Sequence, residues 1–167
     1  MLKRLFVIGC VALAAANVFA MGQMPSAGAS GGLTGKPAPE FTLEHTSGGQ
    51  KTLREARNGK KSVIFFWATW CPHCHDEILH ISNNLATLNQ KGIQVVLVDM
   101  GEGKEEVQEY LLRNKVGFES FIDGDNSLQG PYGIIGIPTL FFVDEKGIVR
   151  NLKYEFPPEY EELFNGT

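Results

Sequence analysis

Residues 62–74 read SVIFFWATWCPHC, and this stretch decides the fold. Its first six residues, Ser62 to Trp67, are mostly apolar and rich in β-branched and aromatic types, which predicts a strand buried on both faces. Cys71 and Cys74 follow with Pro72 between them, and proline suits the first turn of a helix. The two cysteines are therefore predicted to lie where a buried strand gives way to a helix.

A single amphipathic helix is predicted from the second cysteine to Lys91, and Gly92 supplies its stop. Its apolar positions recur at alternating steps of four and three: Cys74, Ile78, Ile81, Leu85 and Leu88. Cys74 therefore faces the core, whereas Cys71 lies at the helix start, where unpaired N–H groups and the helix dipole stabilise an anion. Such a position lowers the pKa of a thiol, so Cys71 is predicted to attack and Cys74 to resolve the mixed disulfide.

Strand and helix patterns alternate along the rest of the chain. Further strands are predicted at residues 41–43, 93–98, 139–143 and 148–154, with turns at 46–49, 58–59 and 144–147. Helices are predicted at 104–115, with Val107, Leu111 and Leu112 inward, and from Pro157 to Phe164. This alternation predicts an α/β fold with a central mixed β-sheet flanked by helices and an antiparallel hairpin at one edge.

The N-terminal residues have the pattern of an export signal. Residues 1–20 combine two basic residues with an apolar run and a cleavage site after Ala20, which predicts a signal peptide and a periplasmic or otherwise extracytoplasmic location. A retained membrane anchor is the alternative, although the run is short for a membrane-spanning helix. Residues 21–35 are rich in Gly, Ser, Ala and Pro and are predicted to be a flexible linker, followed by one domain at residues 36–167.

Charge and cysteine content exclude some classes of function. Without residues 1–20 the chain has 13 basic and 19 acidic residues, a net charge of −6 that does not suit nucleic acid. Only Cys71 and Cys74 remain, separated by two residues. In an oxidising compartment so close a pair favours catalysis over a structural role, because its bridge would close almost no loop.

Three spaced motifs resemble a known superfamily. Residues 66–74, FWATWCPHC, and residues 136–139, GIPT, resemble the thioredoxin superfamily. Residues 35–43, GKPAPEFTL, are similar to the opening of its exported TlpA/ResA-like branch and to that of the peroxiredoxins. The resemblance implies a thioredoxin fold with an N-terminal extension, and thiol:disulfide oxidoreductase activity without a cofactor. A peroxidase is disfavoured because Ile64 and Ala68 replace the Pro and Thr of the peroxiredoxin Pro-x-x-x-Thr-x-x-Cys pattern.

The resemblance also implies roles for residues around the cysteines. It implies a cis peptide before Pro138 that sets Ile137 and Pro138 against the pair, with the adjacent backbone binding an extended substrate segment. Pro138 is accordingly predicted to be a catalytic-site residue, and the contacts to substrate are predicted to come from Trp70, Pro72, His73 and Ile137. The alternative for Pro138 is an ordinary proline at the start of a strand.

Glu77 is the remaining predicted catalytic residue. It lies three residues after Cys74, at the edge of the apolar stripe, and members of the resembling branch carry a glutamate at this spacing. Partial burial would favour its protonated form and let it hold or pass a proton as Cys74 ionises. The alternative is a solvated glutamate that favours the helix dipole.

His73 bears on the direction of electron flow. An imidazolium would stabilise the Cys71 thiolate, and stabilising the reduced form makes a disulfide more oxidising. The Pro-His pair resembles strongly oxidising DsbA-type proteins, whereas the rest of the chain resembles exported reductases. These signals conflict, and they predict a potential less reducing than the roughly −270 mV of thioredoxin. His75, His80 and Asp76 are predicted to be solvated helix residues.

Metal sites and partners complete the expectations. Structural zinc is disfavoured because a second Cys-x-x-Cys is absent and His75 and His80 would point away from Cys74. The rival function is copper binding or delivery on the same fold, for which His45 is the only upstream histidine. The favoured reading has no metal and no cofactor. It predicts a monomer that acts on protein thiols and disulfides, with a membrane thiol electron donor and clients such as apocytochrome c implied by the resembling branch.

Overall fold

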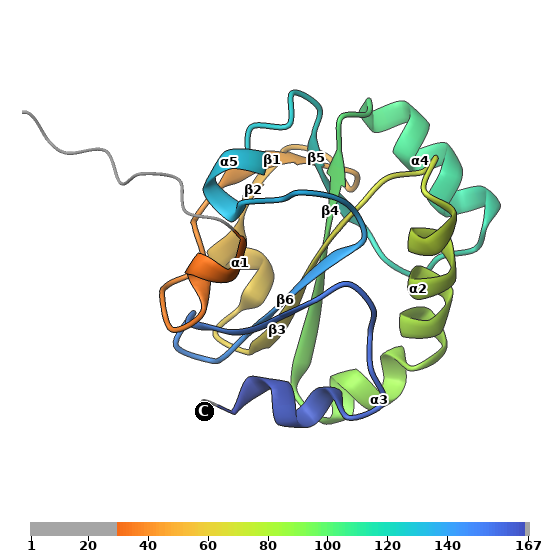
Figure 1. Ribbon diagram of the computed structural model, residues 1–167. Helices are drawn as coiled ribbons and strands as arrows, with labels where there is room; N and C mark the ends of the chain where they lie inside the picture. The colour runs from red at the N-terminus through yellow and green to blue at the C-terminus, as the bar shows by residue number, and fades with distance from the viewer. Residues whose placement is uncertain (1–29, 166–167) are drawn as a thin grey trace, which may run out of the picture.

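A computed structural model describes residues 30–165 and shows one seven-stranded sheet flanked by helices (Figure 1). The sheet order is β2-β1-β5-β4-β3-β6-β7, with parallel pairing between β3 and β4 and between β4 and β5, and antiparallel pairing elsewhere. The strands are β1 Thr42–His45, β2 Gln50–Thr52, β3 Lys61–Trp67, β4 Ile93–Met100, β5 Ser120–Asp123, β6 Thr139–Val143 and β7 Val149–Lys153. The predicted α/β fold with a central mixed sheet is confirmed.

The helices are divided between the two faces of the sheet. They are α1 Leu53–Arg57, α2 Pro72–Asn83, α3 Leu85–Gln90, α4 Lys104–Arg113 and α5 Gln129–Tyr132, with short 3-10 segments η1 Ser30–Leu33 and η2 Tyr160–Phe164. Figure 1 shows α2, α3 and α4 on one face and α1 and α5 on the other. Each face therefore has its own apolar core.

Alternation along β3 supplies both cores, because successive side chains of a strand point to opposite faces. Val63, Phe65 and Trp67 pack against α2 and α4, in a cluster that also contains both cysteines. Ile64 and Phe66 pack on the other face with Leu53 of α1 and Tyr132 of α5. All five β3 side chains are fully buried, and each such burial stabilises the fold by roughly 1.5–3 kcal/mol. The strand that leads to the cysteines is thus firmly held in the centre of the sheet.

Two helical predictions were wrong in detail. The single helix predicted up to Lys91 is interrupted at Asn84, whose backbone leaves helical geometry (φ −101°, ψ 4°) and whose Nδ2 donates to the His80 carbonyl at 2.9 Å. Leu112, predicted inward, is 80% exposed. Tyr110 takes the third inward position of α4 instead, because positions 107, 110 and 111 lie on one helical face.

The ends of the chain differ from the expected boundaries. Leu33 of η1 packs against the core, and Gly35 N–H donates to the Val149 carbonyl at 2.8 Å, so ordered contacts begin upstream of the predicted start at Lys36. The C-terminal helix predicted from Pro157 is the shorter segment η2. The signal peptide predicted for residues 1–20 and linker residues 21–29 lie outside the described residues. Within residues 30–165, no helix is long and apolar enough to cross a membrane.

Candidate active site

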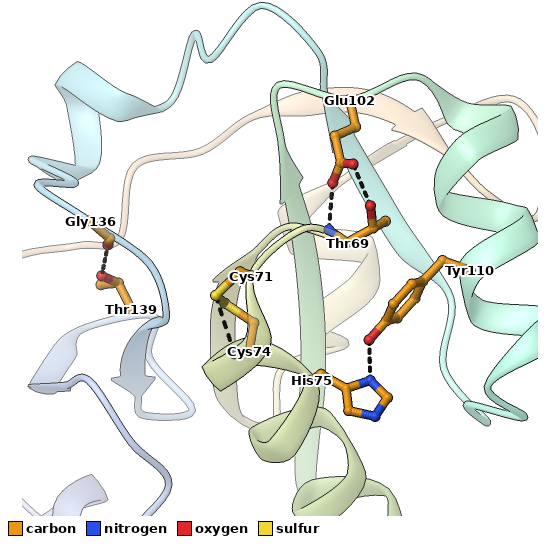
Figure 2. Close-up of a disulfide and its surroundings, with 8 residues drawn as sticks. All are labelled: Thr69, Cys71, Cys74, His75, Glu102, Tyr110, Gly136 and Thr139. Carbon is orange, nitrogen blue, oxygen red and sulfur yellow. Dashed lines mark hydrogen bonds between the residues drawn. A yellow bond between two sulfur atoms is a disulfide. The ribbon is translucent and has the colours of Figure 1, made fainter.

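Cys71 and Cys74 form a disulfide at the start of α2 (Figure 2). Cys71 is the N-cap residue of this helix, and its Sγ accepts a hydrogen bond from Cys74 N–H at 3.2 Å. Cys71 is 5% exposed and Cys74 is completely buried. After reduction, the Cys71 sulfur would therefore be the more accessible one, with a backbone donor and the positive end of the helix dipole already beside it.

A loop before β6 faces the cysteine pair. The peptide bond between Ile137 and Pro138 is cis, which confirms the prediction. Thr139 Oγ1 donates to the Gly136 carbonyl at 2.6 Å and so closes this loop, which Figure 2 shows opposite the disulfide. Ile137 packs against the apolar cluster that contains both cysteines. The loop therefore lies across from the disulfide, against the apolar cluster that contains both cysteines.

A shallow hollow of about 310 Å³ lies beside this loop. Trp70, Met100, Ile134 and Ile137 give it apolar walls, and Asn126 and Gln129 add amide groups. Trp70 is 67% exposed, which leaves a large aromatic surface without protein contacts next to Cys71. Two of the predicted substrate contacts, Trp70 and Ile137, thus lie in one hollow. The other two, Pro72 and His73, are exposed on the first turn of α2 and do not line it.

Glu77 is half-buried, as predicted, and it has a partner that the sequence did not indicate. Its Oε2 accepts a hydrogen bond from the Phe156 N–H at 2.8 Å. Phe156 follows β7 and is buried in the same cluster as the cysteines. The carboxyl group therefore joins α2 to the C-terminal segment, and the predicted proton transfer to Cys74 stays a prediction.

Two substitutions separate these roles of Glu77. Glu77→Gln keeps an oxygen for Phe156 N–H but cannot ionise, so one titration is expected to disappear from the pH profile of Cys74 alkylation while the free energy of unfolding changes by less than about 0.5 kcal/mol. Glu77→Ala removes the acceptor and is expected to lower the free energy of unfolding by about 1–2 kcal/mol. Alkylation of the Cys71→Ser form across pH, with urea unfolding, measures both effects. An unchanged Cys74 profile in Glu77→Gln would remove the proton-transfer role.

Residues missed by the sequence analysis lie directly behind the cysteine loop. Glu102, in the loop between β4 and α4, accepts hydrogen bonds from Thr69 N–H at 2.6 Å and Thr69 Oγ1 at 2.5 Å (Figure 2). Asp99, near the end of β4, is fully buried, and its Oδ1 accepts the Glu102 N–H at 3.2 Å. An acidic residue at the end of an apolar strand was the one available signal, and it did not point to Thr69.

His75 also differs from its prediction as a solvated residue. It is half-buried, and its Nδ1 is hydrogen-bonded to the Tyr110 hydroxyl (Figure 2). Tyr110 lies on α4 and packs on Trp67 with ring centroids 5.3 Å apart. The first turn of α2 is therefore tied to α4, while His80 is exposed as predicted and rests edge-on against Phe156.

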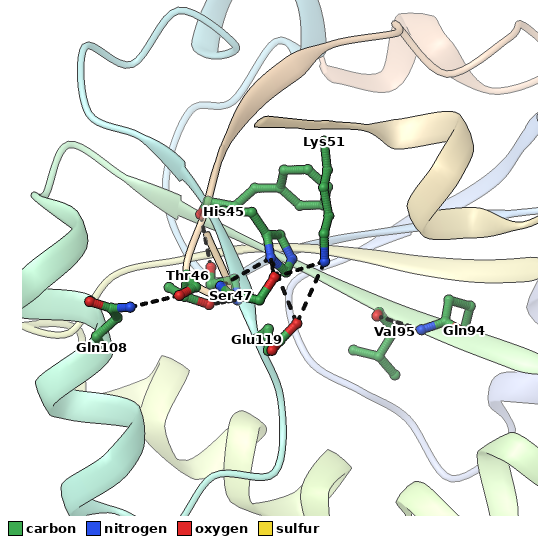
Figure 3. Close-up of polar contacts among 10 residues, drawn as sticks. His45, Thr46, Ser47, Lys51, Gln94, Val95, Gln108 and Glu119 are labelled. Carbon is green, nitrogen blue, oxygen red and sulfur yellow. Dashed lines mark hydrogen bonds and ion pairs between the residues drawn. The ribbon is translucent and has the colours of Figure 1, made fainter. Parts of the chain in front are cut away.

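A larger hollow, of about 720 Å³, lies away from the disulfide and is lined in part by His45, Lys51 and Glu119 (Figure 3). His45 is buried, with Nδ1 2.7 Å from Ser47 Oγ, and Lys51 Nζ donates to the same hydroxyl at 2.8 Å. Burial and the Lys51 charge lower the pKa of His45, against the opposing effect of Glu119.

The contacts of His45 give it a structural role. Its Nδ1 contacts the Ser47 hydroxyl and N–H in the turn after β1, and Figure 3 shows its ring pointing at this turn. His45 does not join the cysteines in a metal site, and residues 30–165 contain no group of three or more His, Cys, Asp or Glu side chains placed to hold a metal ion.

Comparisons with known proteins agree with this geometry. The model of the AhpC/TSA family matches residues 34–152. Thiol-disulfide oxidoreductase ResA of Bacillus subtilis is 31% identical over 115 residues, which cover 69% of this chain and 64% of that protein. Thiol:disulfide interchange protein DsbE of Yersinia pestis is 37% identical over 123 residues, covering 71% and 62%. The chain thus spans slightly less than two thirds of the length of these relatives.

Solved structures give the same fold. The crystal structure of a putative thiol:disulfide interchange protein DsbE from Chlorobium tepidum superposes with a TM-score of 0.68 at 28% identity, covering 77% of this chain and 90% of that one. The thioredoxin domain of a thiol-disulfide oxidoreductase from Bacteroides vulgatus superposes with a TM-score of 0.69 at 21% identity, covering 78% and 94%. The predicted thioredoxin fold is confirmed.

Proposed function

This chain belongs to the AhpC/TSA family of thioredoxin-fold proteins, and on that premise we propose that it is a thiol:disulfide oxidoreductase acting on protein thiols and disulfides through Cys71 and Cys74. The observation that carries the proposal is the cysteine pair itself. One sulfur caps the start of α2 and accepts a backbone N–H, while its disulfide partner is completely buried. This asymmetry suits one attacking and one resolving sulfur.

The exchange proceeds in two balanced steps. In the reducing direction, the Cys71 thiolate attacks a substrate disulfide, forms a mixed disulfide and releases one substrate thiolate. The Cys74 thiolate then attacks Cys71 Sγ, which releases the second substrate sulfur and restores the Cys71–Cys74 disulfide. The substrate gains two electrons and, at neutral pH, two protons. The oxidising direction runs the same steps in reverse, and neither direction requires a metal or an organic cofactor.

The surroundings of the disulfide support a protein substrate. The loop at Ile137 and Pro138 offers backbone groups to an extended segment, and the adjoining hollow offers Trp70 as an apolar contact. Pro72 and His73 are exposed beside Cys71 in the sequence, so a substrate could contact them. A substrate with an apolar side chain near its cysteine fits this surface.

Location and partners follow from the sequence pattern and from the relatives. We place the mature protein outside the cytoplasm, with residues 1–20 as its signal peptide. A membrane thiol protein would supply electrons if the pair works as a reductase, and cytochrome c maturation is the proposed pathway, with apocytochrome c thiols as clients. The proposed working form is a monomer, and both sulfurs that the exchange uses lie on one chain.

The Cys74→Ser variant tests the function. It can carry out the first attack but cannot resolve it, so reduced Cys74→Ser mixed with a disulfide-containing peptide is expected to accumulate a one-to-one adduct on Cys71 that dithiothreitol releases. Mass spectrometry identifies the modified residue, and the Cys71→Ser/Cys74→Ser form is the matched control. Absence of an adduct at Cys71 would refute the proposal. Alkylation of cells before lysis then gives the direction, since a mostly reduced pair indicates a reductase.

A further inference from the structure

A buried carboxyl pair supports the loop that leads into the disulfide. Thr69 lies two residues before Cys71, and both of its donors, the backbone N–H and the hydroxyl, point at the Glu102 carboxyl group. Cys71 N–H donates in turn to the Ala68 carbonyl at 3.2 Å, so residues 68–71 form a tight turn. Fixing Thr69 therefore fixes the turn that carries the attacking sulfur (Figure 2).

We infer that Glu102 is a positioning residue for Cys71, and that Asp99 keeps a proton beside it so that the pair carries a single negative charge. The pair would hold the turn and also set how readily Cys71 ionises. This inference rests on the proposed function, because it concerns the sulfur that attacks. It extends that function by adding two residues that touch neither substrate nor sulfur.

Glu102 is the member of the pair that suits the negative charge. Two donors at 2.5 and 2.6 Å point at its oxygens, and charge-assisted hydrogen bonds of this kind are short. Glu102 also directly precedes Gly103, the N-cap residue of α4, where the positive end of a ten-residue helix favours an anion. Both observations place the charge on Glu102.

Asp99 is the member that suits the proton. It is completely buried, and within residues 30–165 its Oδ2 has no hydrogen-bond partner. A protonated Oδ2 would become a donor, and the adjacent Glu102 carboxylate is the acceptor it could reach. Burial first, and then the neighbouring Glu102 side chain, raise the pKa of Asp99 to about 9, against the lowering effect of the Glu102 N–H. The orphaned oxygen and the raised pKa have one explanation, a proton held between the two carboxyl groups.

The groups around Asp99 do not offer a compensating cation. From α4, the Glu106 carboxylate adds to the negative charge, and Tyr110, whose hydroxyl is hydrogen-bonded to His75, lies near Glu102. The neighbours of Asp99 in the sheet are Trp67 on β3 and Ile122 on β5, which are uncharged. None of the ion pairs in the described residues includes Asp99 or Glu102. Keeping the proton is therefore the way this site avoids two adjacent buried charges.

The charge of Glu102 has a consequence for Cys71. A fixed negative charge beside the turn opposes formation of the Cys71 thiolate, against the helix dipole that favours it. Removing the charge should favour the thiolate and so make the disulfide more oxidising. Ionisation of Asp99 at alkaline pH adds a second negative charge and should therefore disfavour the Cys71 thiolate.

The pH dependence of Cys71 alkylation, measured in the Cys74→Ser form of the chain, tests this inference. Glu102→Gln keeps an oxygen for Thr69 N–H but removes the charge, so the rate of Cys71 alkylation between pH 5 and 6 is expected to rise about threefold to tenfold. Glu105→Gln is the matched control, because it makes the same change at an exposed position of α4, and its profile should coincide with that of the unchanged chain. A Glu102→Gln profile that coincides with the control, or that moves to higher pH, would overturn the inference.

A second measurement needs no substitution at the pair. Carboxyl carbon NMR of the folded chain is expected to show Asp99 titrating near pH 9. A midpoint in the ordinary range of aspartate would overturn the shared proton. This measurement remains available even if Glu102→Gln fails to fold. Alkylation involves no substrate disulfide, so the two proposals fail separately. If the protein shows no exchange activity but Glu102→Gln still speeds Cys71 alkylation, the proposed function alone is refuted. If exchange occurs but Glu102→Gln leaves Cys71 alkylation unchanged, the inference about the carboxyl pair alone is refuted.

Discussion

Cys71→Ser is expected to abolish thiol–disulfide exchange, lowering the turnover of a disulfide-containing peptide by at least about 10³-fold. A serine hydroxyl at this position remains protonated at neutral pH and cannot form a disulfide. Cys74 is expected to react far more slowly than Cys71, because its side chain in the first turn of α2 is completely buried. The loss is measured as the rate at which peptide thiols appear when dithiothreitol supplies the electrons.

Cys74→Ser separates the two sulfurs when the reduced protein is freed of dithiothreitol before it is mixed with the peptide. It is expected to release one rapid equivalent of peptide thiol, from the first attack by Cys71, and then to stop, whereas the unchanged chain releases two. The Cys71→Ser form should give no such burst. A burst in Cys71→Ser, or release of a second equivalent by Cys74→Ser, would contradict the assignment of Cys71 as the attacking sulfur and Cys74 as the resolving one.

The parts of the site that the sequence predicted are those encoded in short segments. The buried strand β3 and the cysteines at the start of α2 each depend on residues within a few positions of one another, whereas the cis peptide before Pro138 was implied by the resemblance. Local pattern is informative there because strand burial on both faces and a proline in the first helical turn leave a direct mark on composition. The resemblance to a known superfamily then related Pro138 to the cysteines, which no local pattern could do.

Contacts between distant segments were not predictable in this way. The hydrogen bonds from Thr69 to Glu102, and from Phe156 to Glu77, join residues that are 33 and 79 positions apart. Either acid would read equally well as a solvated side chain, since nothing nearby in the sequence indicates the N–H that it accepts. These contacts form only in the folded chain, where β3 pairs with β4 and the C-terminal segment packs in the same cluster as α2.

Short elements were not predicted from the sequence for a related reason. Strand β5 has only four residues, and both its ends are polar, yet all four are buried. Ser120 can be buried there because its hydroxyl accepts a hydrogen bond from Trp67 Nε1 at 3.1 Å, a tertiary contact that satisfies the polar group. Periodicity over four residues cannot reveal such a strand. It does not reveal the interruption at Asn84 either, where the side chain donates to the His80 carbonyl.

Asp99→Asn is expected to stabilise the folded chain at pH 7 by about 2 to 4 kcal/mol. Aspartate ordinarily titrates near 3.8, and burial with the Glu102 contact raises the pKa of Asp99 to about 9 in the folded state. Between these values the folded chain binds one more proton than the unfolded chain, so the free energy of unfolding falls as the pH rises, by about 1.4 kcal/mol per pH unit from this group. Stability from the protonated carboxyl is complete below about pH 3.8 and is lost progressively up to about pH 9.

Asparagine reproduces the protonated form of Asp99 without this dependence on pH. Its Nδ2 can donate to the Glu102 carboxylate, and its Oδ1 can accept the Glu102 N–H as Asp99 Oδ1 does at 3.2 Å. Urea unfolding of the oxidised protein at intervals from pH 5 to 8 should therefore give a flatter stability profile for Asp99→Asn than for the unchanged chain, with Glu105→Gln as the control that retains the slope. Equal slopes for Asp99→Asn and the unchanged chain would mean that Asp99 is ionised in the folded state. The orphaned Oδ2 would then need a donor other than its own proton.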